Sequence, residues 1–364
     1  MKKISSIIIV GIFFCVLLLP HVADRLVKIE HSAIDENRNL TPFPTKIKYR
    51  NIARQLEEYY NDRIPFRTIL LKGCRNLQSK LLAFTPGNAV PGKNDFLFFR
   101  PPGWEDPLDQ FCGKGRLRGY DLLQNKKFLC EFNSFLVKNN IRFLLVIAPN
   151  KVQVYPEYLP ERRKYPASEF MPDLQLVRVM KKDNPEIAIM HLRDALLDAK
   201  KYYADNLFYR ADTHWNRVGG YIGAREIIKH FNAQANLPEP GNFSLTKCSS
   251  NEPTDIVNLS LTPVNYAVYQ ELSPCIPKYD KPLKKISGNH LYSYNADAPD
   301  KRRVLIYRDS FTTAMIPYIS NYFREVHYIW SHKVSTAQIA DIKPDIVILE
   351  YVARILGCMQ IKLE

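Results

Sequence analysis

Three residues in the C-terminal half of the chain are of the types that activate a serine nucleophile. Asp212 stands two positions before His214, and Ser310 follows the strand-like run Val304–Tyr307. A serine hydroxyl attacks acyl groups when an imidazole removes its proton and a carboxylate holds that imidazole in the right tautomer. In Asp-x-His the carboxylate can reach Nδ1 from a turn at a helix start, which leaves Nε2 for a hydroxyl. The three residues are therefore a candidate catalytic set for acyl transfer.

The same residues also have an ordinary structural explanation. Asp212 could cap the helix that follows it, His214 could be a buried side chain, and Ser310 could be a second cap. A serine between a strand and a helix is, on the other hand, placed like the nucleophile of other α/β sheets. Spacing alone leaves both interpretations open.

The elements that must position these residues follow an alternating pattern. Apolar residues recur at helical spacing between Leu122 and Leu136, and the run Phe143–Ala148 is apolar throughout. A helix that leads into a fully buried strand is typical of a parallel sheet. Alternation of this kind predicts an α/β fold, a doubly wound parallel sheet sandwich with right-handed crossovers. Further helices are predicted at Asp173–Met180, Val218–Phe231, Thr313–Tyr322 and Thr336–Ile342, and further strands at Ile187–Leu192, Val304–Tyr307, Val326–Trp330 and Ile346–Glu350.

The alternation also predicts the domain organisation. Residues 116–360 are expected to form the catalytic domain, and residues 24–115, with a helix near Ile52–Asn61, to form a segment packed on it. Residues 235–302 are rich in Pro, Ser, Asn and Tyr and interrupt the alternation, which predicts an insertion or lid before the nucleophile.

The N-terminus has the layout of an export signal. Lys2 and Lys3 precede the apolar run Ile4–Leu19, and Pro20 follows it. We expect residues 1–23 to be an uncleaved anchor, with the lysines in the cytoplasm and the rest of the chain outside it. A signal peptide cleaved near Ala23 is the alternative. The predicted location is the periplasm or the outer face of the cytoplasmic membrane.

Composition restricts the partners. The chain has 364 residues, of which 46% are hydrophobic, so it can bury a core, and its net charge is +14. A basic exported protein attracts anionic polymers or anionic lipid head groups, whereas export separates it from nucleic acid. Six basic residues could line a groove for uronate carboxylates or could simply form a solvated face: Lys281, Lys284, Lys285, Lys301, Arg302 and Arg303.

Cysteine and histidine usage favours disulfides over a metal site. Six of the seven cysteines follow the apolar run, and an oxidising compartment permits disulfides among them. Cys248 with Cys275 is the pair that the sequence favours, with free thiols as the alternative. No Cys or His spacing matches a zinc site, so no metal is expected.

The chain resembles a known family over residues 36–354. It looks like the SGNH hydrolase-like O-acetyltransferases of bacterial exopolysaccharide synthesis, the alginate O-acetylase type represented by AlgX and AlgJ. No single motif is specific, but their order and separation together are. The motifs are Glu36–Leu40, Pro42–Pro44, Leu56–Arg67, Gly92–Phe99, Ala148–Lys151, Val154–Pro156, Tyr209–Asn216 and Arg308–Phe311.

The resemblance implies an SGNH-hydrolase-like fold and gives each member of the candidate set a role. Ser310 would be the nucleophile, His214 the base and Asp212 its orienter. The acetyl group would pass through Ser310 to a hydroxyl of a polysaccharide, either neutral or anionic, without a cofactor. A membrane-bound acyl carrier protein of the same pathway would be the donor partner. An acetyl-esterase and a non-catalytic polysaccharide-binding or assembly protein are the alternatives.

One position departs from the family pattern. The family block usually reads Gly-Asp-Ser, whereas Arg308 precedes Asp309 here. We expect Arg308 to point away from the substrate with ordinary backbone angles, because a guanidinium beside His214 would disfavour the imidazolium that forms during attack. The alternative is that it enters the site and meets an anionic acceptor.

Four further residues are weaker candidates for substrate contact. Asn150 follows the strand Phe143–Ala148, where ligands of such sheets bind, and could donate to an oxyanion together with the backbone N–H of Ser310. It could equally be a turn residue. Trp215 could pack against a sugar ring or fill the core, and the assignments of Tyr155 and Arg354 are weaker still.

Overall fold

The computed structural model describes residues 13–14, 42–44, 52–63, 89–101, 106–114, 119–160, 166–203, 207–248, 255–256 and 271–356. Contacts divide the chain into two compact units. The first comprises Met1–Ala89 with Val257–Asn265, and the second comprises Val90–Ile256 with Tyr266–Glu364. In the first unit the structure describes helix α2 (Ile52–Asn61), which has the bounds expected from the sequence. The second unit contains the central sheet.

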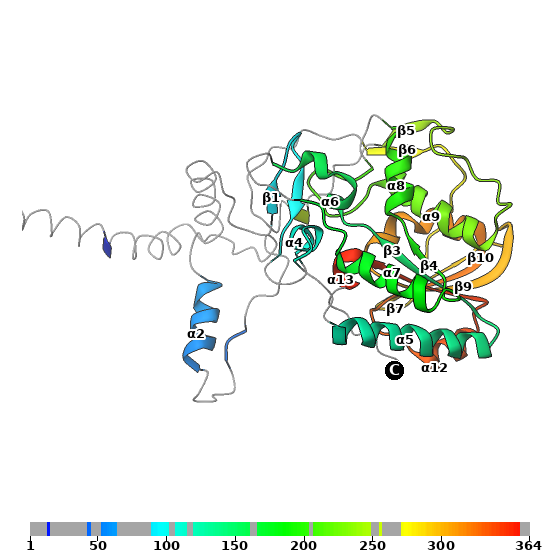
Figure 1. Cartoon of the computed structure of the whole chain (residues 1–364), viewed down its shortest axis with the longest axis horizontal. Helices are drawn as coiled ribbons and strands as arrows, with labels where there is room; N and C mark the ends of the chain where they lie inside the picture. Colours follow the sequence, from blue (N-terminus) through cyan, green and yellow to red (C-terminus); the bar gives the residue numbers. More distant parts are fainter. Residues whose placement is uncertain are drawn as a thin grey trace, which may run out of the picture. The chain divides into compact units, whose positions relative to one another are not determined.

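The central sheet has seven strands, five of them parallel (Figure 1). The strand order is β4-β3-β11-β9-β10-β8-β7. Strands β8 and β7 run antiparallel at one edge. The strands are β3 (Arg142–Ala148), β4 (Ile189–His191), β7 (Lys284–Ser287), β8 (His290–Tyr294), β9 (Asp300–Arg308), β10 (Phe323–Trp330) and β11 (Ile346–Val352).

The expectation of a wholly parallel sheet is therefore wrong at one edge. Strands β7 and β8 are joined by only two residues, Gly288 and Asn289. A loop of this length can return the chain only antiparallel, because a parallel neighbour needs a crossover of a dozen residues or more. The sheet is mixed, and residues 284–294 belong to it although the sequence placed them in an insertion.

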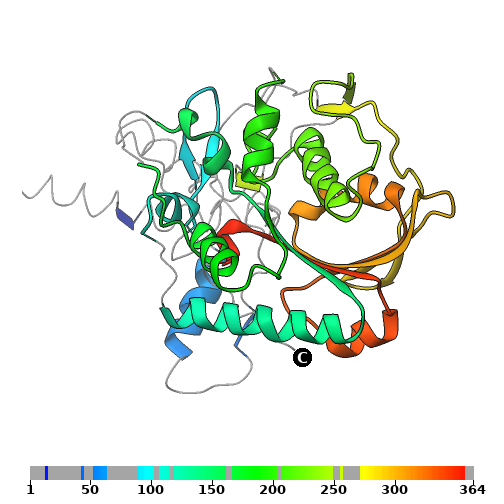
Figure 2. The ribbon, with the colours of Figure 1, turned by 45° about the vertical axis from the view of Figure 1, so that its right-hand side comes forward.

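Helices cover both faces of this sheet (Figure 2). Along β3, Leu144 and Val146 face one apolar core, and Leu145 and Ile147 face the other. The side chains alternate because successive residues of a strand point to opposite faces. The first core is closed by α6 (Lys151–Val154), α8 (Arg193–Lys200), α9 (Arg217–Phe231) and α11 (Ile316–Tyr322), and the second by α5 (Gly119–Lys138), α7 (Pro172–Asp183), α12 (Thr336–Ile342) and α13 (Ala353–Leu356).

Short elements complete the second unit. Strand β5 (Leu245–Cys248) pairs antiparallel with β6 (Glu271–Pro274), and β1 (Ala89–Pro91) pairs with β2 (Leu97–Phe99). Phe96, Phe98 and Leu108 of residues 90–114 are buried in the first core. The remaining elements are helix α4 (Pro107–Phe111) and the 3-10 turns η2 (Pro156–Tyr158) and η3 (Phe311–Ala314).

The disulfide predicted between Cys248 and Cys275 does not form, since Cys275 is a free thiol. Cys248 pairs with Glu271 in the β5–β6 ladder, whereas the backbone N–H of Cys275 donates to Ser244 O at the other end. Four residues of strand separate the two ends by roughly 13 Å. A disulfide needs Cα atoms within about 7 Å of each other, so this pairing register excludes it.

The predicted N-terminal anchor lies outside the described residues, except for Phe13 and Phe14. Within the part of the chain that the structure describes, none of the helices is both long and apolar enough to cross a membrane.

Candidate active site

The structure brings Asp212, His214 and Ser310 into one hydrogen-bonded chain. His214 Nδ1 lies 2.6 Å from Asp212 Oδ1, and His214 Nε2 lies 2.6 Å from Ser310 Oγ. With the Nδ1 proton donated to the carboxylate, Nε2 can accept the proton of the serine hydroxyl. This is the geometry of a nucleophile, a base and an orienting carboxylate.

A tight turn before α9 holds the Asp–His pair. Asp212 Oδ1 also accepts a hydrogen bond from the backbone N–H of His214 at 2.9 Å, so that one oxygen fixes both main chain and ring. Asn216 caps α9 by accepting from Val218 N and Gly219 N. The helix cap is thus Asn216 and not Asp212, which leaves the aspartate carboxylate to His214.

Ser310 lies at the carboxyl end of β9, where the chain enters η3 with ordinary helical backbone angles. Asp309 fixes the turn of residues 309–311, called here the nucleophile turn, by two hydrogen bonds. Its Oδ1 accepts from Phe311 N at 2.8 Å, and its Oδ2 accepts from Val352 N at 2.7 Å. Trp215 Nε1 donates to Phe311 O at 2.9 Å, which ties the nucleophile turn to the His214 turn.

Helix α9 approaches the nucleophile turn closely because Gly220 has no side chain. A Cβ atom at this position would lie 2.5 Å from Ala314 Cβ and 2.7 Å from Ala314 O. Real Cβ atoms essentially never come within 3.0 Å of another heavy atom, so a larger residue would push α9 and the preceding His214 turn away from η3.

A cavity of about 560 Å³ opens at the Ser310 hydroxyl. Two cationic side chains, Arg217 and Lys278, lie on its rim and are exposed to solvent. Aromatic side chains form much of the remaining wall. The lining residues are Tyr209, Asp212, His214, Trp215, Arg217, Ser273, Lys278, Ser310, Phe311, Thr313, Ala314, Pro317 and Tyr318.

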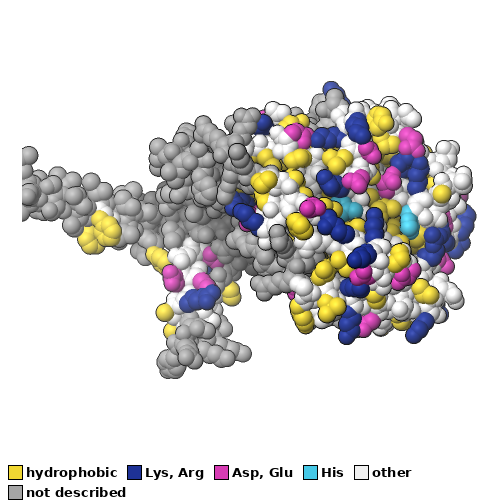
Figure 3. All heavy atoms as spheres, in the orientation of Figure 1, with side chains coloured by type: hydrophobic (Ala, Val, Ile, Leu, Met, Phe, Trp, Pro, Cys, Tyr) yellow, Lys and Arg dark blue, Asp and Glu magenta, His cyan; other side chains and the backbone are white. Residues whose placement is uncertain are grey.

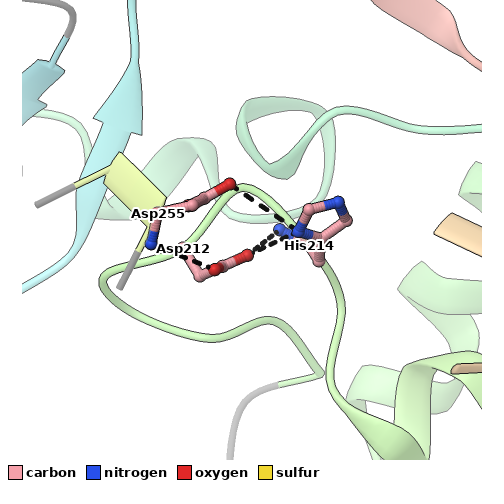
Figure 4. A group of neighbouring side chains, drawn as sticks. All are labelled: Asp212, His214 and Asp255. Atoms are coloured by element: carbon pink, nitrogen blue, oxygen red, sulfur yellow. Dashed lines mark hydrogen bonds and ion pairs between the residues drawn. The ribbon is translucent and has the colours of Figure 1, made fainter. Parts of the chain in front are cut away.

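A second carboxylate lies beside the Asp–His pair (Figure 4). Asp255 Oδ2 is 3.7 Å from His214 Nδ1, and the backbone N–H of Asp255 donates to Asp212 Oδ2 at 3.2 Å. Burial and the negative charge of Asp212 raise the pKa of Asp255 to about 6. Burial would also raise the pKa of Asp212, but the hydrogen bonds and charge of His214 outweigh it and bring that pKa below its usual value.

These three side chains are also the one group of potential metal ligands among the residues that the structure describes, with ligand atoms within 4.8 Å of one another. The two best donors, His214 Nδ1 and Asp212 Oδ1, are already bonded to each other at 2.6 Å.

Arg308 lies beneath the nucleophile turn and is not among the residues that line the cavity. Only 5% of it is exposed, its Nη1 donates to Asp309 O at 3.0 Å and to Thr313 Oγ1 at 2.9 Å, and its guanidinium lies over the Trp330 ring. Burial lowers the pKa of Arg308, and the nearby carboxyls of Glu350 and Asp309 partly offset this decrease. Through these two hydrogen bonds the Arg308 side chain stabilises the nucleophile turn from the side opposite the cavity.

Asn150 and Arg354 lie in a different small hollow, where Arg354 Nη1 donates to Asn150 Oδ1 at 3.3 Å. Strand β11 separates β3, which precedes Asn150, from β9, which precedes Ser310. Asn150 is not among the residues that line the cavity at Ser310. Tyr155 is buried in the first core, where its hydroxyl accepts from Leu207 N.

Two of the six basic residues expected near Ser310, Arg302 and Arg303, are not close to it in the fold. Arg302 and Arg303 lie at the start of β9, whereas Ser310 follows its end. They form ion pairs with Asp300 and Glu325. Sequence reasoning missed the cations that do line the cavity, Arg217 and Lys278, and it missed Asp255, because no local motif marks any of the three.

The fold is an α/β sandwich with a mixed central sheet, and the carboxyl edge of its parallel strands carries a hydrogen-bonded Asp–His–Ser chain. Residues 111–267 match the family described as "SGNH hydrolase-like domain, acetyltransferase AlgX". "Probable alginate O-acetylase AlgJ" of Azotobacter vinelandii is 25% identical over 233 residues, which are 63% of this chain and 55% of that protein. Over residues 111–267 the chain is thus similar to the AlgX/AlgJ-type SGNH hydrolase-like family, and it spans about half the length of this curated relative.

Solved structures share the fold. PatB1 of Bacillus cereus is 15% identical with a TM-score of 0.52, and the match covers 77% of this chain and 100% of that one. The structure of PatB1 with a sulfonyl adduct is 14% identical with a TM-score of 0.51, covering 75% of this chain and 98% of that one.

Proposed function

We propose that the protein is an O-acetyltransferase that moves an acetyl group to hydroxyls of an extracytoplasmic polysaccharide through an acyl-enzyme on Ser310. The observation that carries the proposal is the hydrogen-bonded chain from Asp212 through His214 to Ser310 at the mouth of a cavity. The family described as an acetyltransferase supports the choice of the acyl group.

The proposed reaction has two steps that use the same base. In the first, His214 Nε2 takes the hydroxyl proton of Ser310 while Oγ attacks the acetyl carbonyl of the donor, and the donor leaves as its alcohol or thiol with that proton. In the second, His214 takes a proton from a sugar hydroxyl, whose oxygen attacks the acetyl-serine, and Ser310 regains its proton. Asp212 stabilises the imidazolium that forms in each step.

The cavity supports a sugar as the acceptor. Tyr209 is a half-buried aromatic residue of its wall, and an amphipathic aromatic ring suits a sugar ring as a packing partner, whereas Trp215 and Tyr318 are buried in the first core. Lys278 and Arg217 place positive charge at the rim, which favours an anionic sugar over a neutral one. Elsewhere, on the face that Figure 3 shows, basic side chains are interspersed with acidic ones and form no single stripe.

The donor partner and the location remain part of this proposal. A membrane-bound acyl carrier protein would deliver the acetyl group, and the protein would work in the periplasm or at the outer face of the cytoplasmic membrane, anchored by its N-terminus. Two features support a location at an anionic membrane surface: the two lysines followed by an apolar run within residues 2–19, and the net charge of +14.

Transfer assays separate this function from its rivals. The protein is incubated with 4-nitrophenyl acetate, with and without uronate oligosaccharides, and both nitrophenol and acetylated sugar are measured. A transferase acetylates the sugar and releases nitrophenol faster when the sugar is present. Nitrophenol and acetate without acetylated sugar would indicate an esterase, and no Ser310-dependent release would indicate an assembly protein.

A further inference from the structure

Asp255 occupies the side of the imidazole that faces away from the nucleophile. Its Oδ2 lies 3.7 Å from His214 Nδ1, while the opposite ring nitrogen, Nε2, lies 2.6 Å from Ser310 Oγ. Asp255 is not among the residues that line the cavity. It therefore acts on the substrate only through His214.

Asp255 and its neighbour bind every residue of the turn from Ala211 to Thr213. Asp255 Oδ1 accepts from Thr213 N at 2.7 Å, and Oδ2 accepts from Thr213 Oγ1 at 2.6 Å. Its backbone N–H donates to Asp212 Oδ2, and Ile256 N donates to Ala211 O, both at 3.2 Å. Figure 4 shows that Asp255 reaches His214 from a segment separate from the one that carries Asp212.

We propose that Asp255 is a positioning residue of the catalytic set, which fixes the Asp–Thr–His turn and holds a second negative charge beside the imidazole. The inference rests on the proposed function. Two carboxylates beside one imidazole stabilise the imidazolium of each transition state more than Asp212 alone. Asparagine keeps an acceptor for Thr213 N but replaces the second oxygen with an amide NH₂, so Asp255→Asn must be compared with a variant that loses the hydrogen bond to Oδ2 and keeps the charge.

The charge of Asp255 depends on pH. Among the described residues, the charged groups that face Asp255 are Asp212 and His214. Two cations, Lys151 and Arg354, line the adjoining hollow together with Thr213 and Ile256. Lys151 donates hydrogen bonds to Leu97 O and Arg210 O, and Arg354 donates to Asn150 Oδ1. Burial and Asp212 raise the pKa of Asp255 to about 6, so this carboxyl gains a proton under mildly acidic conditions.

The test compares pH profiles of kcat/KM for 4-nitrophenyl acetate in the full-length chain and three variants. In the unaltered protein we expect log kcat/KM to fall on the acidic limb of the profile with a slope greater than one per pH unit, because protonation of either His214 or Asp255 slows attack. Asp255→Asn should lower the plateau about tenfold to a hundredfold and reduce the limb to a single proton. Thr213→Val removes the contacts of Thr213 Oγ1 with Asp255 Oδ2 and His214 Nδ1 but keeps the charge of Asp255, so its acidic limb should stay steep.

Two results would overturn the inference. The first is an Asp255→Asn variant whose kcat/KM has the same plateau and the same acidic slope as that of the unaltered protein. The second is an acidic slope of one proton in the unaltered protein itself, a result that does not require any variant to fold. The third variant, Ser310→Ala, separates this failure from that of the proposed function. If the unaltered protein were no faster than Ser310→Ala, both proposals would be contradicted.

Discussion

His214 Nε2 lies 2.6 Å from Ser310 Oγ, although the two residues are 96 positions apart in the chain. His214 comes from the turn before α9, and Ser310 from the end of β9. Two contacts between these segments hold the distance: the hydrogen bond from Trp215 Nε1 to Phe311 O, and the close approach of Gly220 to Ala314. The predictions below follow from this arrangement.

The triad should behave as a unit. Single changes of Ser310, His214 or Asp212 to Ala should each abolish nitrophenol release from an activated acetyl ester, and double changes should cost little more. The Asp212 variant should be the mildest of the three. Steady-state rates measure the effect, and Ser287→Ala, on the exposed strand β7, is the matched control. Full activity in Ser310→Ala would refute the assignment of the nucleophile.

Gly220→Ala should separate His214 from Ser310 while keeping the helix. The added Cβ would meet Ala314 at 2.5 Å, so we expect a loss of activity of at least about tenfold and of stability of about 1 to 3 kcal/mol. Gly223→Ala is the control, because its Cβ would meet the flexible ends of Met315 and Leu192 at 3.0 Å and 3.3 Å and Trp215 Cη2 at an ordinary contact distance of 3.4 Å. Kinetics and thermal unfolding measure both effects. Equal behaviour of the two variants would show that the packing does not set the catalytic distance.

Arg308→Gly should affect stability more than chemistry. The variant loses hydrogen bonds to Asp309 O and Thr313 Oγ1 and the contact with Trp330, which predicts a destabilisation of about 1 to 3 kcal/mol. Activity of the folded variant should change less than about tenfold, because the side chain does not line the cavity. Denaturant unfolding and kcat measure the two effects. A large gain in activity would instead show that the arginine obstructs the site.

Glu350 should make the folded protein less stable as pH rises. Burial and the charge of Asp309 raise its pKa well above the usual 4.5, so the folded state keeps a proton that the unfolded chain releases. Stability is therefore lost as pH increases above about 4.5, at most about 1.4 kcal/mol per pH unit from this group. Glu350→Gln, which can still accept from Thr312, should remove this dependence in urea unfolding between about pH 5 and about pH 8.

Glu325→Gln is the control with the opposite sign. The hydrogen bond from Arg303 lowers the pKa of Glu325, so its carboxylate stabilises the folded state above the pKa of the unfolded chain. The glutamine should reduce stability at neutral pH. Unfolding curves of Glu350→Gln that fall with pH as steeply as those of the unaltered protein would contradict the assignment to Glu350.

Much of the sheet could be predicted because its buried strands are apolar along their whole length. The runs Phe143–Ala148 and Ile346–Glu350 became β3 and β11 within two residues at each end, and α12 has the predicted bounds. The antiparallel edge could not be predicted in this way. Strand β7 is exposed throughout and carries Lys284 and Lys285, so it has no apolar pattern to recognise.

The site was predictable only where local sequence fixes it. Asp212 and His214 belong to one turn, so their spacing was informative, whereas Asp255 reaches them across more than 40 positions through tertiary contacts alone. Asn150 was expected beside Ser310, but it is not among the residues that line the cavity. Its strand and that of Ser310 are separated by β11, and strand order in a sheet does not follow from the sequence pattern of each strand.

The central claim is that Ser310 carries the acetyl group between donor and acceptor. The direct measurement is mass spectrometry of peptides from protein that is quenched in acid during turnover of 4-nitrophenyl acetate. We predict an acetyl group on the peptide that contains Ser310, which disappears when a sugar acceptor is added before the quench and never forms in Ser310→Ala. An unmodified Ser310 peptide in an actively transferring sample would contradict the account.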